Sequence, residues 1–186
     1  MANEWGPLDA LAGDWEGEGG LDTAYSNSKG EVIGTPYREK LSMKPFGPVE
    51  NGAQVLYGLD YKTAMWRDDE ENPFHTEVGY WLWDAGTGEI MRGFVVPRGI
   101  TILAGGTCEP DAKMFSMGAK LGAPGGYSIG ENIYLGAKAS TKSYEVTISV
   151  HDDGTWSYQE STILEMHAMD GTEFAHTDTN TLKRVG

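Results

Sequence analysis

The sequence predicts an all-β fold of roughly ten antiparallel strands, closed into an up-and-down barrel with a short N-terminal helix and a central cavity. Many short runs alternate apolar and polar residues, as half-buried strands do. Twenty-six glycines separate these runs and supply tight turns. Closing the sheet removes its exposed edges, and roughly eight strands already leave room for a ligand. Without a repeat or linker signature, the chain reads as one domain, 1–186.

The elements follow in order along the chain. Residues 7–13, PLDALAG, predict the short helix, because Pro7 suits a first helical turn and Gly13 suits a helix end. Segment 108–130 contains five glycines and two prolines and predicts a long loop or lid, or a segment that is partly helical around 112–121. The expected strands are 14–19, 35–46, 53–66, 75–83, 89–96, 99–107, 131–140, 143–150, 155–166 and 173–185.

The two ends of the barrel are expected to meet. Gly13 and Trp15 begin the first strand and Arg184 ends the last, so the arginine can lie over the indole ring. A cation–π contact of this kind contributes roughly 0.5–2 kcal/mol. We expect it to seal the barrel floor, whereas the alternative is an exposed arginine and an unrelated core tryptophan.

Charge and composition exclude several classes of partner. The formal net charge is −14 and the basic residues form no stripe, which argues against nucleic acid and against anionic membrane surfaces. Cys108 is the single cysteine, so neither an internal disulfide nor a multi-cysteine zinc site is possible. No stretch approaches the roughly 20 apolar residues that span a bilayer. A soluble cytoplasmic protein without membrane insertion is the expectation.

The last predicted strand carries the leading candidate for a metal ligand. On period-two alternation His176 shares a face with Asp178, Asn180 and Leu182. A neutral imidazole nitrogen is a good donor to iron, and a nearby acid can orient the ring. A polar cavity or rim histidine without a metal is the other interpretation of the same pattern.

Five motifs, in the correct order, resemble the nitrobindin family of small haem-binding β-barrels. Residues 11–19, LAGDWEGEG, resemble its opening, and 73–83, PFHTEVGYWLW, its central histidine motif. FVVPRGITILAGGT resembles the strand, proline turn and strand that follow. YEVTISVHDDGTWSYQESTILEM resembles the hairpin with a methionine, and FAHTDTNTLKR resembles the closing histidine strand.

The resemblance implies haem b as cofactor, with His176 as the iron ligand and with His75, Phe74 and Met166 around the bound group. It further implies nitric oxide binding or peroxynitrite isomerisation by the haem, and a homodimer is plausible in barrels of this kind. The chain departs from the family in one way that affects the site. The spacing from His176 to Leu182 is one residue longer, so the direction of the histidine depends on whether a bulge absorbs that residue.

Two other functions remain open from the sequence. One is a haem-free carrier of a fatty acid or another apolar small molecule, for which an interior cation is needed. Arg38, Arg92 and Lys62 are the candidates for that cation. The other is an interaction module with a filled barrel, because no Gly-x-Ser-x-Gly elbow, Walker loop or His-Glu-x-x-His motif is present.

Overall fold

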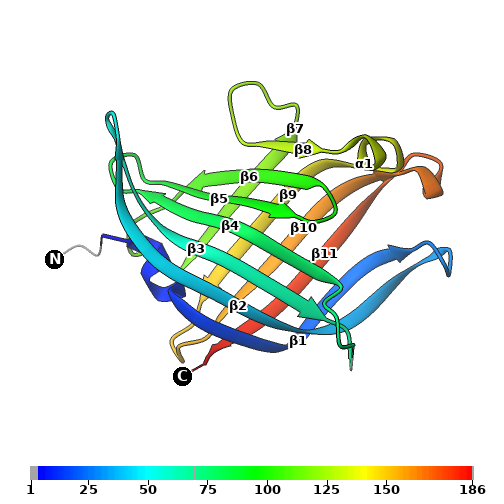
Figure 1. The fold of residues 1–186 in the computed structure, drawn as a ribbon, viewed down its shortest axis with the longest axis horizontal. Helices are drawn as coiled ribbons and strands as arrows, with labels where there is room; N and C mark the ends of the chain where they lie inside the picture. The colour runs from blue at the N-terminus through cyan, green and yellow to red at the C-terminus, as the bar shows by residue number, and fades with distance from the viewer. Residues whose placement is uncertain (1–3, 69, 186) are drawn as a thin grey trace.

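The computed structural model is an all-β closed barrel (Figure 1) and describes residues 4–68 and 70–185. Eleven strands and three short helical segments follow one another along the chain. They are η1 (Gly6–Leu11), β1 (Gly13–Ser26), β2 (Glu31–Asn51), β3 (Gln54–Trp66), β4 (His75–Asp84), β5 (Glu89–Val96), β6 (Ile100–Thr107), β7 (Met114–Leu121), β8 (Ser128–Glu131), α1 (Ile133–Lys138), β9 (Ala139–Val150), β10 (Trp156–Met166), η2 (His167–Met169) and β11 (Thr172–Arg184).

The strands form one hydrogen-bonded ring in the order β1-β11-β10-β9-β7-β8-β6-β5-β4-β3-β2. Antiparallel pairing of β1 with β11 closes the ring, with Trp15 opposite Arg184. The predicted closed barrel is therefore confirmed. One departure from a simple meander is β8, which lies between β7 and β6 and pairs with β7 in parallel.

Segment 108–130 contains the strands β7 and β8 instead of a long loop or a helix. In β7 the side chains of Phe115, Met117 and Ala119 are buried and alternate with more exposed neighbours, which is the period of a half-buried strand. The expected strand at 131–140 is wrong for a local reason. Asn132 accepts a hydrogen bond from the Leu135 backbone N–H at 2.9 Å, and this N-cap begins α1.

One end of the barrel is closed by η1, whose buried Leu8 and Leu11 belong to the hydrophobic core. Trp15 donates its indole N–H to the Leu11 carbonyl at 2.8 Å, and the Arg184 guanidinium lies 4.4 Å from the centre of the Trp15 ring. Arg184 also donates to the carbonyl of Ala12 at 2.5 Å. The predicted seal between the first and last strands is confirmed.

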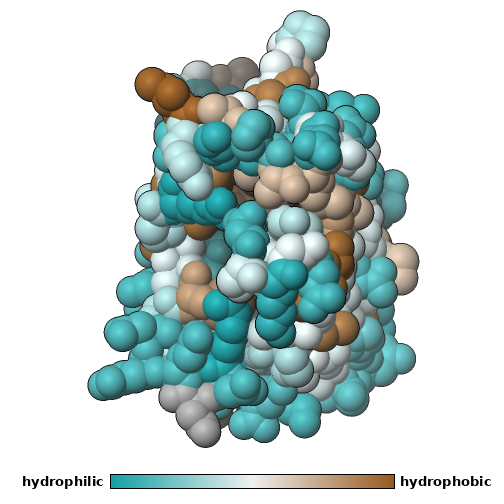
Figure 2. Space-filling model, turned by 90° about the vertical axis from the view of Figure 1, so that its right-hand side faces the viewer, coloured by the Kyte–Doolittle hydropathy of each residue, from teal (hydrophilic) through white to brown (hydrophobic). Residues whose placement is uncertain are grey.

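The opposite end is built from turns and from α1, on the right-hand side of Figure 1. The β1–β2 turn, the β3–β4 loop, the β5–β6 turn and the η2 turn all lie at this end. In Figure 2, which faces this end, mainly hydrophilic residues surround a hollow. Among the helices of residues 4–68 and 70–185, none has the length and apolar character needed to cross a bilayer.

Candidate functional site

The barrel holds a cavity of about 510 Å³, and Leu135 of α1 is part of its lining. This volume lies within the range of roughly 300–1,000 Å³ that small-molecule sites occupy. The proposal of a filled barrel is therefore wrong. Apolar and aromatic side chains form much of the wall, including Tyr61, Trp81, Phe94, Ile100, Ile102, Leu135, Tyr144, Ile148, Trp156, Tyr158 and Leu164.

His176 projects into this cavity from β11. The strand pairs with β10 from Thr172 to Leu182 without a shift in register, and His176 stands opposite Thr162, which also lines the cavity. Side chains two residues apart in a strand point to the same face of the sheet. His176 therefore points to the same face as buried Leu182, six residues further along β11. The spacing from His176 to Leu182 is one residue longer than in the family, yet His176 still faces the cavity although β11 has no bulge in its pairing with β10.

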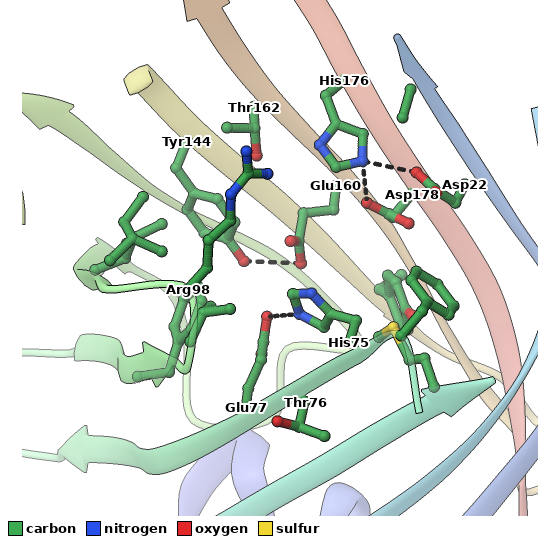
Figure 3. Close-up of a pocket in the computed structure, with 18 of the residues that line it drawn as sticks. Asp22, His75, Thr76, Glu77, Arg98, Tyr144, Glu160, Thr162, His176 and Asp178 are labelled. Atoms are coloured by element: carbon green, nitrogen blue, oxygen red, sulfur yellow. Dashed lines mark hydrogen bonds and ion pairs between the residues drawn. The ribbon is translucent and has the colours of Figure 1, made fainter. Parts of the chain in front are cut away.

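Two carboxylates hold the His176 ring (Figure 3). Its Nε2 lies 2.7 Å from Oδ1 of Asp22 and 3.3 Å from Oδ2 of Asp178. Burial alone would lower the pKa of His176, but the hydrogen bond to Asp22 and the charges of Asp178 and Asp22 outweigh burial and raise that pKa. Burial, together with the charges of Glu160 and Asp22, raises the pKa of Asp178 to about 7 despite the opposing charge of His176.

His75 lies at the first position of β4 and faces the same cavity (Figure 3). Its Nε2 is 3.0 Å from Oε1 of Glu77. Burial would lower the pKa of His75, but the bond to Glu77 and its charge raise it. Phe74 lines the cavity beside it, and Arg67 lies over the Phe74 ring at 4.0 Å.

Deeper in the barrel, a buried arginine is shared between two carboxylates. Arg92 lies 2.5 Å from Oε2 of Glu77 and 2.8 Å from Oε2 of Glu160. Tyr61 donates to Glu77 at 2.5 Å, and Tyr144 donates to Glu160 at 2.8 Å. The guanidinium is also within cation–π distance of the rings of Tyr61, Trp81, Phe94 and Tyr144. The charge of Arg92 is thus paired with two carboxylates of the protein, while its buried Nε has no hydrogen-bond partner among the described residues.

Glu39 is another buried carboxylate in this region. It accepts hydrogen bonds from Thr63 at 2.7 Å, from Tyr158 at 2.8 Å and from Asn180 at 3.0 Å. Burial raises the pKa of Glu39, and these three donors oppose that rise. With Asp22, Glu77, Glu160 and Asp178, it makes five carboxylates that line the cavity.

The structure brings together most of the predicted site residues. His176, His75 and Phe74 line one cavity, whereas Met166 is buried at the end of β10 opposite Ala139 and is not part of the lining. Met166 lies on the same face of β10 as the lining residues Thr162 and Leu164, but at the end of the strand, so its place beside a bound group stays a prediction.

Of the three candidate interior cations, only Arg92 lines the cavity. Arg38 lies outside it, over Trp66, and Lys62 is exposed. Asp22 and Glu160 also line the cavity, and no pattern in the sequence predicts this. Asp22 comes from β1 and reaches His176 only through the closure of β1 on β11, which no local pattern reveals.

A small closed barrel with a histidine-bearing cavity defines a ligand-binding β-barrel. Over residues 4–184 the chain matches the model of the THAP4-like, heme-binding beta-barrel domain, and it belongs to that family. The resemblance to the nitrobindin family is thereby confirmed. The fold also matches the crystal structure of Rv2717c from M. tuberculosis with a TM-score of 0.63 and 19% identity, covering 97% of this chain and 98% of that one. No curated protein matches the chain.

Proposed function

We propose that the cavity binds haem b and that His176 is the axial ligand of the iron. The observation that carries this proposal is the arrangement of the His176 ring inside the cavity. Its Nε2 is held by Asp22, while its Nδ1 has no hydrogen-bond partner among residues 4–68 and 70–185. Histidines that ligate metals commonly use one ring nitrogen for the metal and give the other to a carboxylate, which orients the ring and raises its basicity.

Part of the cavity wall is apolar and would suit a porphyrin ring. Phe94, Ile100 and Ile102 come from β5 and β6, and Leu135 of α1 and Leu164 of β10 also face the cavity. Burial of an apolar body against such side chains is favourable in proportion to the area removed from water. The residues present therefore fit the ring system of haem as well as its iron.

His75 faces the same cavity and would act on a small ligand of the bound group. It enters from β4, and Glu77 fixes its ring and keeps its pKa raised. A histidine held this way can keep a proton and donate it to an oxygen atom of a small ligand. When bound, haem supplies an iron that takes diatomic gases, and we propose nitric oxide binding or peroxynitrite isomerisation as its chemistry.

Titration of the purified protein with hemin, followed by absorption, tests this proposal. We expect a saturable Soret shift for the native chain and its loss in His176→Ala. His167→Ala is the matched control, because His167 is exposed in η2 and does not line the cavity. An equal shift in both variants, or no saturable shift in the native chain, would rule out His176 as the axial ligand.

The structure weakens the alternative of a fatty acid bound deep in the barrel. Such a ligand needs a cation for its carboxylate, and Arg92 already pairs with Glu77 and Glu160. A second carboxylate beside these two would be repelled. Displacement of a fluorescent fatty-acid analogue by hemin, measured on the same protein, separates the two functions.

A further inference from the structure

The interior of the cavity is unfavourable for an anionic group. Five carboxylates line it, and Arg92, the one interior arginine in the described lining, is already bound to two of them. Like charges at short range in a partly dry site destabilise each other strongly. A ligand that carries an acidic group must therefore leave that group at the open end.

Arg98 stands at this open end, in the turn between β5 and β6. It lines the cavity, although much of its surface is exposed, and Figure 3 shows its side chain extending into the pocket. It makes no ion pair with any residue that the structure describes. Arg92 is paired with Glu77 and Glu160, whereas the charge of Arg98 is left for a ligand.

The backbone around Arg98 is held firmly. Asn132 donates its side-chain N–H to the Arg98 carbonyl at 2.9 Å, and the Asn132 backbone N–H donates to Gly99 at 2.9 Å. The same Asn132 side chain caps α1. Gly99 has a φ of +92° and no room for a Cβ atom beside Asn132, so the turn requires glycine. A turn tied to a helix cap presents the arginine at a defined position.

We propose that Arg98 is the anchor for the acidic group of the cavity's ligand, which lies with its apolar body inward and its carboxylates at the open end. For haem b these carboxylates are the two propionates, so this inference extends the proposed function. Arginine suits the role because its planar guanidinium can bind a carboxylate through two parallel hydrogen bonds. Arg67, stacked on Phe74 at the same end, is positioned to add a second positive charge.

The test uses an iron-free porphyrin, so that it does not depend on iron ligation. Protoporphyrin IX carries two carboxylates, and its dimethyl ester has the same ring without the charges. Binding of each is measured by fluorescence with the native chain, Arg98→Ala and Lys183→Ala. Lys183 is exposed on β11 and outside the cavity, so its replacement removes the same charge elsewhere.

We expect Arg98→Ala to weaken binding of the diacid by about tenfold, as loss of a charge-assisted hydrogen bond does, and to leave the diester unchanged. Lys183→Ala should bind both as the native chain does. Equal affinity of the native chain and Arg98→Ala for the diacid overturns the inference. So does an equal loss for diacid and diester, or an absence of diacid binding to the native chain.

The outcome is separable from the test of His176. If hemin gives no Soret shift that depends on His176 but diacid binding still depends on Arg98, the haem proposal fails and the anchor stands. If the Soret shift depends on His176 while Arg98→Ala binds the diacid normally, the axial ligand stands and the anchor fails.

Discussion

Asp22 and His176 are 154 positions apart in the chain, and Oδ1 of the one lies 2.7 Å from Nε2 of the other. The contact exists because β1 and β11 close the barrel with Asp22 directly opposite Asp178, two residues from His176. One imidazole is thereby placed between two carboxylates, with Glu160 close enough to add its charge. The strand pairing that closes the barrel also determines the environment of the candidate ligand.

Replacing Asp22 by asparagine removes the charge that holds the His176 ring. We expect the affinity for hemin to fall by about 10–100-fold, the usual loss when the hydrogen-bond partner of a metal-ligating histidine is changed. Asp60→Asn, an exposed substitution on β3, makes the same change in charge and should bind hemin normally. Titration by absorption measures both, and native affinity in Asp22→Asn would show that the carboxylate plays no part in ligation.

Glu77→Gln is expected to destabilise the barrel by about 3 kcal/mol at neutral pH, because it leaves buried Arg92 with Glu160 as its one carboxylate partner. Burial alone would raise the pKa of Glu77, but Arg92 and the hydrogen bonds from His75 and Tyr61 lower it from 4.5 to about 2. A lowered pKa in the folded state gives stability above about pH 4.5 that is lost as the pH falls toward 2.

The difference in unfolding free energy between the native chain and Glu77→Gln should therefore shrink as the pH falls from 4.5 toward 2. Urea unfolding at several pH values measures it. Glu18→Gln, an exposed change on β1, serves as the control and should follow the native chain. A difference that stays constant with pH would mean that Glu77 is not ionised in the folded barrel.

Arg184→Ala should lower the unfolding free energy by about 1 kcal/mol, since it removes the cation over the Trp15 ring and the hydrogen bond to Ala12. Lys183→Ala removes a neighbouring charge that makes neither contact and should be nearly neutral. Urea unfolding compares the two, and similar values for both would show that the contact does not stabilise the barrel.

Gly79→Ala should destabilise the protein by about 2 kcal/mol or more through overpacking. A Cβ atom at position 79 would collide with the carbonyl oxygen of Gly93 on the neighbouring strand β5. The backbones of β4 and β5 lie so close together at this point that only glycine fits at position 79. Gly19→Ala is the control, because no heavy atom lies within 4 Å of its added Cβ. Thermal unfolding distinguishes them, and equal midpoints would contradict the argument.

The sequence is most informative where structure depends on neighbours in the chain. Alternation and glycine spacing predict the strands. The contact between Trp15 and Arg184 could be predicted because the two residues lie near the start of the first strand and at the end of the last one. The side of the cavity on which His176 lies also follows from alternation, once β11 runs without a bulge. In segment 112–121, one interior glycine, Gly118, and the two lysines hide the alternation of Phe115 and Met117.

The remainder depends on contacts between distant strands. Nothing near Asp22 indicates that it will face a histidine, and nothing near Glu160 indicates that it will share Arg92 with Glu77. The α-helix at 133–138 depends on one capping side chain, Asn132, within a segment that otherwise resembles a strand. Met166 shows the limit of alternation itself, which gives the face of a residue but not its depth along the barrel.

Closure of the strand ring affects how fast a ligand can enter and leave the cavity. Among the described residues, every strand is hydrogen-bonded to neighbours on both sides and η1 covers one end, so we expect a ligand to enter and leave through the end where Arg98, Arg67 and α1 lie. Substitutions in those turns should change association and dissociation together. Substitutions among the interior carboxylates should change the lifetime of the complex and leave its speed of formation almost untouched.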